Sequence, residues 1–599
     1  MPALRKSTEP EAARAFLSVE RSLSGKRWRA RAADEALVEA HRRSLHLPEI
    51  AARLLAGRGV SAADAPGFLN PTLRDFFPDP STFADMDKAA AIIEDAIVSG
   101  RPTAVFCDYD VDGATSGAQL VRYFRARGRD LRIYVPDRMT EGYGPSEGAF
   151  AKLKAEGVSL VITVDCGAAA EGPLTAAAAM GLDVVVLDHH LMSGAPPPAA
   201  AVVNPNRPDC PSGQGALTAA GVVLVALAAI NREARKRGSI GSNHLPNPLD
   251  NLDLSALGTV CDVAPLRGFN RAIVAQGLKV LAKNNNIGLA ALARAAGRET
   301  CSSVYDLGFV LGPRINAGGR IGDASLATRL LSSDDPAEAE GIALQLDALN
   351  AERRKQEADM LAEATAMAEA QARDRPIVIV GSPRWHPGVI GIAAGRLKER
   401  LLKPVIVLGG VTPDEPAKGS GRSVPGVNLG AAVAAAARDG VALAGGGHAM
   451  AAGLTVAWDR VDALRDFLSA QIADACAAAE GDARTLEIDA QAGVAALTLD
   501  LIAALDRIGP YGPGHPEPVL ALSDVRATYT GPTKGGHLRC VLEDARGAKI
   551  RGIAFRAENT ALGEALQRGE PIHAAVKLKK NEWGGAARAE IEVLDAAKA

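Results

Sequence analysis

Between residues 103 and 188 the chain carries four short apolar runs that alternate with stretches of helical character. The apolar runs cover residues 103–107, 131–135, 160–164 and 183–187. The stretches between them cover residues 116–127, 146–155 and 174–180. Short apolar runs bounded by turn residues are typical of strands buried on both faces, and alternation with helices implies parallel crossovers. The sequence therefore predicts an α/β fold with a Rossmann-like, doubly wound parallel sheet.

The rest of the chain changes character at four points. Its 599 residues are too many for one hydrophobic core, because domains usually span about 100–200 residues. Residues 1–95 read as a polar, helical N-terminal segment, and 96–335 contain the predicted parallel sheet. Residues 336–374 have almost no helix breakers and predict a long connecting helix. A second α/β unit follows at 375–482, and the short alternating strands of 483–599 favour a small β-barrel.

Composition excludes several classes of protein. The first residues contain no apolar run typical of a signal peptide, and no stretch of about 18 apolar residues occurs. We therefore expect a cytoplasmic protein with no membrane partner. The seven cysteines form no CxxC pair, which argues against a disulfide framework and a zinc ribbon. With a net charge of −3, any binding of nucleic acid requires a local basic patch.

Acidic and imidazole side chains follow three of the predicted strands. In chain order these side chains are Asp108, Asp110, Asp112, Asp165, Asp188, His189 and His190. Because the carboxyl ends of parallel strands meet at one edge of a sheet, we expect them to converge there. Asp262, in GTVCDVAPL, follows another short apolar stretch, which we take as a further strand end that joins the group.

Such a group of carboxylates requires a counter-charge. Like charges at contact distance cost several kcal/mol or force protonation, so a bound cation is expected. Oxygen ligands with one or two imidazoles suit Mn²⁺ or Mg²⁺. Two such ions, roughly 3.5–4 Å apart, activate water for attack at phosphorus. A single DxD turn or His-His pair is more often a solvated surface feature, but four elements at predicted strand ends together favour a metal site.

These motifs resemble those of the DHH phosphoesterase superfamily. The resemblance rests on DYDVDG at 108–113, Asp165 in VDCG, the DHH triplet at 188–190, and Asp262 in GTVCDVAPL. Further segments resemble the RecJ branch of that superfamily: residues 134–144, 203–209, 312–320, 419–423 and 445–453, with FLNP, YGPGHPEP and NEWGG. The similarity covers nearly the whole chain.

The RecJ resemblance implies a metal-dependent 5′-to-3′ exonuclease that degrades single-stranded DNA to mononucleotides. It implies roles in DNA recombination and in recombinational, mismatch and base-excision repair, with single-stranded DNA-binding protein and a RecQ-type helicase as partners. In this assignment 96–335 is the DHH catalytic domain and 375–482 the DHH-associated domain. Residues 483–599 then form an oligonucleotide-binding (OB)-like domain that binds nucleic acid.

The resemblance also implies roles for individual residues. The implied ligands of a two-metal Mn²⁺ or Mg²⁺ site are Asp108, Asp110, Asp112, Asp165, His189 and Asp262. The implied catalytic residues are Asp110, Asp112, Asp165, His189 and His190. The implied substrate-binding residues are Arg138, Asp188, Arg314, Asn316, Arg320, Ser420, Arg422, Gly446, Gly447 and His448. Of these, Arg138, Arg320, Ser420 and Arg422 match positions associated with the 5′-phosphate, which guanidinium groups suit chemically.

Two alternatives remain for the function. One is a small-substrate DHH phosphoesterase that cleaves short oligoribonucleotides or a nucleotide phosphate, and the additional domains argue against it. The other is a catalytically inactive RecJ-like replication scaffold, and the complete Asp and His set argues against that.

Basic residues are dense in the C-terminal domain. Those expected along its strands are Lys534, Arg539, Lys549, Arg551, Arg556, Lys577, Lys579 and Lys580. Each alone is an ordinary solvated residue, but their density predicts a face that follows a phosphate backbone. Trp583 is either a platform for a base or a core residue.

Overall fold

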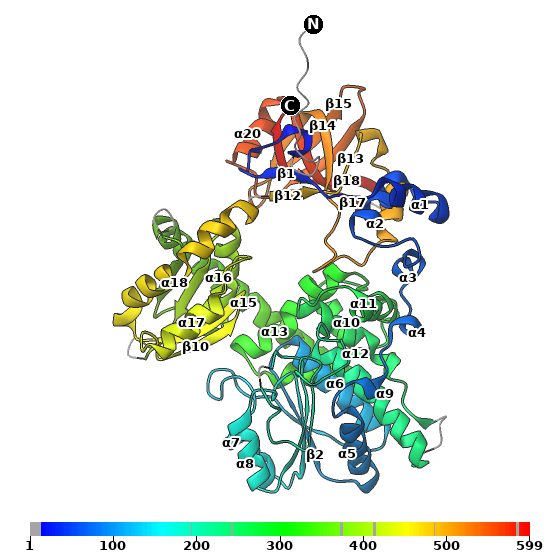
Figure 1. Ribbon diagram of the computed structural model, residues 1–599, viewed down its shortest axis with the longest axis vertical. Helices are drawn as coiled ribbons and strands as arrows, with labels where there is room; N and C mark the ends of the chain where they lie inside the picture. The colour runs from blue at the N-terminus through cyan, green and yellow to red at the C-terminus, as the bar shows by residue number, and fades with distance from the viewer. Residues whose placement is uncertain are drawn as a thin grey trace. The chain divides into compact units, whose positions relative to one another are not determined.

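The computed structural model describes residues 14–599 except 193, 241–243, 372–374, 411, 413–414, 484 and 583–585 (Figure 1). Trp583 therefore lies outside the described residues. The chain forms two compact units. Of the described residues, unit 1 comprises 14–70, Ala478–Tyr511 and His515–Ala599, and unit 2 comprises Pro71–Ala477 and Gly512–Gly514. Among the helices of the described residues, none is long and apolar enough to span a bilayer.

Unit 2 contains the predicted parallel sheet. Its strands, in spatial order, are β3 (Arg132–Tyr134), β2 (Thr103–Cys107), β4 (Leu160–Val164), β5 (Asp183–Leu187) and β6 (Ala201–Val203). Every neighbouring pair is parallel. Strands β2 and β4 are buried throughout, which explains why their sequences are apolar without alternation.

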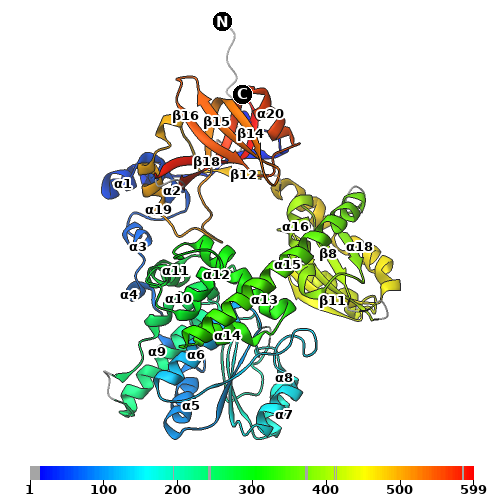
Figure 2. The ribbon, with the colours of Figure 1, turned by 180° about the vertical axis from the view of Figure 1, so that it is seen from behind.

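Helices cover both faces of this sheet. One face packs against α5 (Met86–Ser99), α6 (Val111–Ala126) and α9 (Ala219–Arg237). The other packs against α7 (Glu147–Ala155) and α8 (Glu171–Ala179), and the two groups lie on opposite sides of the sheet in Figures 1 and 2. The expectation of a doubly wound α/β sheet is therefore confirmed.

Further helices extend the α6 side of the sheet. They are α10 (Leu252–Cys261), α11 (Gly268–Leu281), α12 (Ile287–Ala295), α13 (Gly312–Ile321) and α14 (Ser325–Ser332). A π-helical segment, η6 (Asp306–Leu311), precedes α13. The long α15 (Pro336–Gln371) follows, as its composition predicts, and leads into the second α/β part.

The second sheet of unit 2 has five strands. In spatial order they are β10 (Ala444–His448), β11 (Ala451–Val456), β9 (Ala417–Arg422), β8 (Val405–Gly409) and β7 (Val378–Ser382). Only β7 and β8 are parallel to each other. The accompanying helices are α16 (Pro387–Leu401), α17 (Leu429–Arg438) and α18 (Val461–Ala483). The C-terminal part of α15 shares a core with α16, β7 and β8, so the connecting helix is also part of this second layer.

Unit 1 is built on a closed barrel. Its strands are β14 (Leu520–Thr533), β15 (His537–Asp544), β16 (Lys549–Ala554), β18 (Arg588–Lys598) and β17 (Ile572–Asn581), and β17 pairs again with β14. Helix α20 (Ala561–Arg568) connects β16 to β17. A five-stranded barrel of this kind confirms the expected OB-like domain.

The N-terminal residues are integral to this barrel unit. Strand β1 (Arg27–Ala30) pairs with β12 (Thr485–Ile488), and Trp28 is fully buried with its Nε1 donating to Asp595 Oδ2 at 3.0 Å. Helices α1 (Glu35–Leu45), α2 (Glu49–Gly57) and α19 (Leu499–Asp506) pack into the barrel core. The segment expected at 1–95 is thus divided: its apolar side chains up to Asn70 complete one core, whereas α4 (Leu73–Phe76) and α5 belong to unit 2.

Candidate metal centre

Asp108 and Asp165 lie at a topological switch point of the parallel sheet. Strands β2 and β4 are neighbours, yet the helices that follow them, α6 and α8, cover opposite faces of the sheet. Asp108 follows β2 and Asp165 follows β4, so both carboxylates stand at the crevice between the two strand ends. Asp165 adopts a left-handed conformation with φ +61°, which is uncommon for a residue other than glycine and is often found at functional sites.

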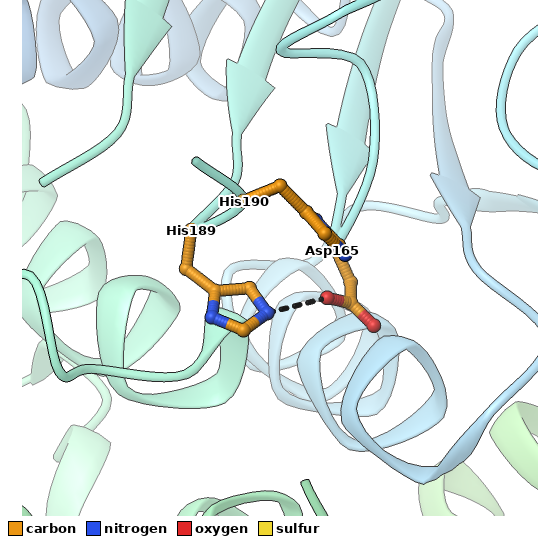
Figure 3. A group of neighbouring side chains, drawn as sticks. All are labelled: Asp165, His189 and His190. Carbon is orange, nitrogen blue, oxygen red and sulfur yellow. Dashed lines mark ion pairs between the residues drawn. The ribbon is translucent and has the colours of Figure 1, made fainter. Parts of the chain in front are cut away.

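His189 connects three of the carboxylates. Its Nε2 lies 3.2 Å from Asp165 Oδ1, 3.8 Å from Asp112 Oδ2 and 3.9 Å from Asp262 Oδ2. Figure 3 shows the imidazole directed at Asp165. The potential ligand atoms fall into three overlapping sets, each within 4.8 Å: Asp108, Asp110 and Asp165; Asp112, His189 and Asp262; Asp165, His189 and His190. The residues expected to meet at the sheet edge do meet there.

Asp110 and Asp112 are fixed by helix termini. Asp110 is the N-cap of α6, and its Oδ1 accepts from the backbone N–H groups of Asp112 at 2.8 Å and Gly113 at 3.1 Å. Asp112 accepts from the N–H groups of Ala219 (2.7 Å) and Ala220 (3.0 Å), in the first turn of α9. Helix α6 therefore starts five residues before the predicted 116, because the acidic motif itself forms its first turn.

Asp262 reaches the group by another route than the one predicted. It does not follow a strand: it is the C-cap of helix α10. The segment LDLSALGTVC is buried on nearly all sides, so its sequence lacks the periodicity that distinguishes a helix from a buried strand. Asp262 lies beside His189 as expected, but the prediction that it follows a strand was wrong.

Asp188 is a supporting residue of the centre. Its Oδ1 accepts from His190 Nδ1 at 2.7 Å and from the His189 N–H at 2.7 Å, and its Oδ2 accepts from the Ala168 N–H at 2.9 Å. Burial opposes its ionisation, but the hydrogen bond and charge of His190 lower the pKa of Asp188 below its usual value. The same contact, against the effect of burial, raises the pKa of His190 to about 9.

Asp108, Asp165 and Asp262 are destabilised as anions. Burial and then the charge of Asp110 raise the pKa values of Asp108 and Asp165 well above normal. Burial and then Asp112 raise the pKa of Asp262 to about 8. Asp108 is 5% exposed, and its Oδ1 has no hydrogen-bond partner among the described residues. Buried carboxylates that repel one another, with Asp108 Oδ1 lacking a hydrogen bond, are what a hard divalent cation would satisfy, so these residues fit a Mn²⁺ or Mg²⁺ site.

A group of three arginines lies near the acidic centre. The Arg138 guanidinium lies 5.1 Å from the centre of the Tyr109 ring, and Arg320 Nη1 donates to Gly388 O at 3.0 Å. Arg422 Nη1 donates to Ser420 Oγ at 3.2 Å and to Gly421 O at 2.8 Å. Burial and then the charge of Arg138 lower the pKa values of both Arg320, to about 10, and Arg422. These side chains, with Ser420, are the residues expected at a 5′-phosphate.

The glycine-rich strand extends the same sheet face. Antiparallel pairing aligns Arg422 with Ala451 and then His448, and aligns Ser420 with Gly453 and then Gly446. Residues opposite one another in a sheet share a face, so His448 and Arg422 lie on one side, two strands apart. Gly447 has φ +144°, and a Cβ there would come within 2.4 Å of Ala451 O, so only glycine fits.

One expected substrate-binding residue, Arg314, has other contacts. Arg314 Nε pairs with Asp347 Oδ1 at 2.8 Å, and its Nη1 donates to Val310 O at 2.7 Å. The bond to Asp347 links α13 to α15. Together the two bonds engage the Arg314 guanidinium within the protein, so it does not need a ligand. Asn316 lies half-buried on α13.

Two further residues beside the centre were not predicted. Tyr143, in the 134–144 segment, donates from its hydroxyl to Asp165 O at 3.2 Å, and the same oxygen lies 3.1 Å from His190 Nε2. His386 caps α16 beside the arginines. The sequence carried a signal for His386, because His-Pro-Gly is typical of a helix start with proline at its first position.

The barrel unit has a groove of its own. Its volume is about 580 Å³, and its walls include Tyr529, Arg539, Arg551, Asn581 and Arg588. Tyr529 is 58% exposed and so has a free ring face. Of the eight basic residues predicted for this domain, Arg539 and Arg551 line the groove.

Four of the predicted basic residues form ion pairs with three glutamates instead. Lys577 and Lys579 both pair with Glu517, at 2.9 and 2.5 Å. The other two pairs are Lys580 with Glu582 at 2.5 Å and Lys549 with Glu543 at 3.5 Å. The groove combines Arg539, Arg551 and Arg588 with one carboxylate, Glu590.

Comparison with known proteins gives consistent matches along the chain. Residues 102–259 match the DHH family N-terminal domain, 374–474 the DHHA1 domain and 488–595 the RecJ OB domain. The single-stranded-DNA-specific exonuclease RecJ of Bacillus subtilis is 34% identical over 578 residues, covering 95% of this chain and 71% of that protein. RecJ of Dickeya dadantii is 36% identical over 557 residues, covering 90% and 94%. The crystal structure of Thermus thermophilus RecJ with Mn²⁺ has a TM-score of 0.79 at 30% identity, covering 96% of this chain and 79% of that chain.

Proposed function

Since this chain belongs to the RecJ family of single-stranded-DNA-specific exonucleases, we propose that it degrades single-stranded DNA from the 5′ end to mononucleotides with Mn²⁺ or Mg²⁺. The observation that carries the proposal is the convergence of five aspartates and His189 at the β2–β4 switch point. A scaffold without activity would not need to retain so many mutually repelling carboxylates.

The residues of the acidic centre would have two kinds of role, metal binding and contact with the substrate. Asp108, Asp110 and Asp165 form one potential ligand set, and Asp112, His189 and Asp262 another. A bound pair of divalent ions supplies Lewis acidity at the phosphodiester and an acidified water molecule. Asp188 keeps His190 oriented and protonated beside the centre, where it can contact a non-bridging phosphate oxygen.

The arginine group provides the basis for polarity. Arg138, Arg320 and Arg422 together offer guanidinium donors suited to the oxygens of a terminal phosphate. Holding that phosphate would fix the end of the strand and leave the adjacent phosphodiester for the acidic centre. We assign this role to the 5′-phosphate, with Ser420 and the glycine-rich strand at 445–448 as further contacts.

The barrel groove would bind an internal stretch of a long strand. A ring face with several guanidinium groups suits stacked bases and a phosphate backbone without sequence preference. Within a cell we expect action in DNA recombination and in recombinational, mismatch and base-excision repair, beside single-stranded DNA-binding protein and a RecQ-type helicase.

One assay tests the proposal. Purified protein is incubated with 5′-phosphorylated single strands labelled at either end, with Mn²⁺, with Mg²⁺ or with EDTA. The expected result is immediate release of the 5′-label as mononucleotide, progressive shortening of 3′-labelled strands, and no product with EDTA. Products trimmed from the 3′ end contradict the polarity. If dinucleotides supplied in a parallel reaction are cleaved and long strands are not, the protein is a small-substrate phosphoesterase, and binding without cleavage identifies a scaffold. Asp165→Ala should abolish cleavage, whereas Asp183→Ala, at the exposed start of β5, should not.

A further inference from the structure

His386 has a defined protonation state because of its place at the start of α16. Its Nδ1 accepts a hydrogen bond from the Gly388 backbone N–H at 3.0 Å, which makes it the N-cap of this helix. A ring nitrogen that accepts a hydrogen bond carries no proton, so the proton of the neutral ring is on Nε2. The half-buried imidazole therefore offers a hydrogen-bond donor on the edge opposite its cap.

The first turns of α16 lie between two of the arginines. Gly388 O accepts from Arg320, and a Cβ on Gly388 would come within 2.3 Å of Arg320 O. A Cβ on Gly391 would come within 2.9 Å of Ser420 Oγ and 3.3 Å of Arg422 Nη2. The helix that His386 caps is thus in direct contact with both arginine-bearing elements, α13 and β9.

Arg138 is the third cation near this ring. Burial and then the charge of Arg138 lower the pKa of His386 below its usual value. The low pKa agrees with the capping geometry, since both require the neutral ring. His386 therefore belongs to the arginine group although it bears no charge.

The arginine group has no directly paired carboxylate among the described residues. Across the described parts of the chain, Arg138, Arg320 and Arg422 form no ion pair with a carboxylate, and Arg320 and Arg422 donate hydrogen bonds to neutral oxygens. Three such guanidinium groups favour an anion. A fourth cation there would add repulsion in the free protein, whereas a neutral N–H adds a donor without that cost.

We propose that His386 contacts the terminal 5′-phosphate through Nε2–H, while its Nδ1 holds the first turn of α16 in place. This inference rests on the proposed function, and it adds a donor from the DHH-associated domain to the arginine and serine positions. Its role differs from theirs, since it discriminates a phosphorylated end by a neutral hydrogen bond and couples that contact to the position of α16.

The two roles of His386 can be separated by substitution. His386→Asn retains a side-chain oxygen, a strong N-cap, but has no donor at the distance of Nε2. His386→Ser is a second capping variant if the first does not fold, and His386→Ala removes both functions. His46→Asn, at an exposed left-handed position in unit 1 that suits asparagine, is the matched control.

The primary measurement is binding without metal. Fluorescence anisotropy in EDTA measures Kd for two 3′-labelled single strands, one with a 5′-hydroxyl and one with a 5′-phosphate. The quantity compared is Kd for the 5′-hydroxyl strand divided by Kd for the 5′-phosphate strand. We expect His386→Asn to reduce this ratio about tenfold, with a thermal midpoint near wild type, and His386→Ala to lower the midpoint as well. With Mn²⁺, the KM for 5′-phosphorylated strands should rise more than kcat falls.

The outcomes distinguish this inference from the proposed function. An unchanged ratio in a folded capping variant would mean that His386 only caps α16. An equal loss for both kinds of end would also overturn the inference, because it indicates a general structural effect. Wild-type protein that binds phosphorylated ends but does not cleave would overturn the proposed exonuclease activity and leave the His386 test valid.

Discussion

Asp188 accepts a hydrogen bond from His190 Nδ1 at 2.7 Å, and this contact separates the tasks of two consecutive histidines. His190 is held by a buried carboxylate, whereas His189 points its Nε2 at Asp165, 3.2 Å away. Such carboxylate–histidine pairs fix ring orientation and tautomer around metal sites. The order Asp-His-His thus provides one supporting residue and two differently placed imidazoles.

Replacing Asp188 by Asn should lower activity without removing a ligand. The amide cannot keep His190 charged or oriented, so kcat should fall by roughly 10–100-fold, the usual cost of losing a supporting partner. Steady-state kinetics with Mn²⁺ and circular dichroism check this. Asp183→Asn, at the exposed end of the same strand, is the control. Wild-type kcat in folded Asp188→Asn would exclude a functional role for the pair.

Metal binding should compete with protons. Because burial and neighbouring charges raise the pKa of Asp262 to about 8, and that of Asp165 upward, the metal-free centre holds protons near neutral pH. A cation must displace them, so affinity should increase as pH rises from 6.5 to 8, about tenfold per pH unit for each proton released. Thermal-shift titration with Mn²⁺ measures this slope. Asp262→Asn should flatten it, and weaker binding at high pH would contradict the assignment.

The barrel groove should account for affinity toward long strands. Arg539→Ala with Arg551→Ala should weaken binding of a long single strand by about tenfold or more and reduce its salt dependence, while cleavage of tetranucleotides persists. Lys577→Ala with Lys579→Ala removes the same charge from residues already paired with Glu517, so its effect should be much smaller. Equal effects of the two double variants would mean that overall charge, and not the groove, binds the strand.

The Trp28–Asp595 contact should stabilise unit 1. Trp28→Phe retains most of the buried area but leaves Asp595, which is fully buried, without its indole donor. Loss of a buried hydrogen bond to a charged group costs about 1–3 kcal/mol, so the unit should unfold at lower denaturant concentration. Trp458→Phe in unit 2 is a control, because its Nε1 is without a partner among the described residues. A change in unit 2 alone would contradict the assignment of residues 14–70.

Sequence patterns located the elements whose environment is uniform. Strands β2, β4 and β5 begin and end at the predicted residues, since buried parallel strands are continuous apolar runs between turns. Strand β6 has only three residues and was not predicted. The acidic positions could be inferred because strand ends of a parallel sheet share an edge, whichever residues surround them.

Features that depend on distant partners could not be predicted. Nothing near Lys577 in the sequence indicates that Glu517 neutralises it. Likewise Arg314 lies in the same sequence motif as Arg320, at residues 312–320. Its ion-pair partner, Asp347, comes from α15 and could not be predicted from that motif. For Asp262, an apolar segment of ten residues fits a helix as well as a strand, and tertiary packing decided between them.

The pairing of the chain's two ends in unit 1 has a consequence for biosynthesis. Trp28 leaves the ribosome 567 residues before Asp595, its hydrogen-bond partner. At about 5–20 residues per second, this corresponds to roughly half a minute to two minutes of synthesis. During that time β1 and the apolar faces of α1 and α2 lack the barrel strands, whereas Pro71–Ala477 of unit 2 are completed before the barrel strands are made. Nascent chains stalled before the barrel should therefore bind chaperones through their first 70 residues.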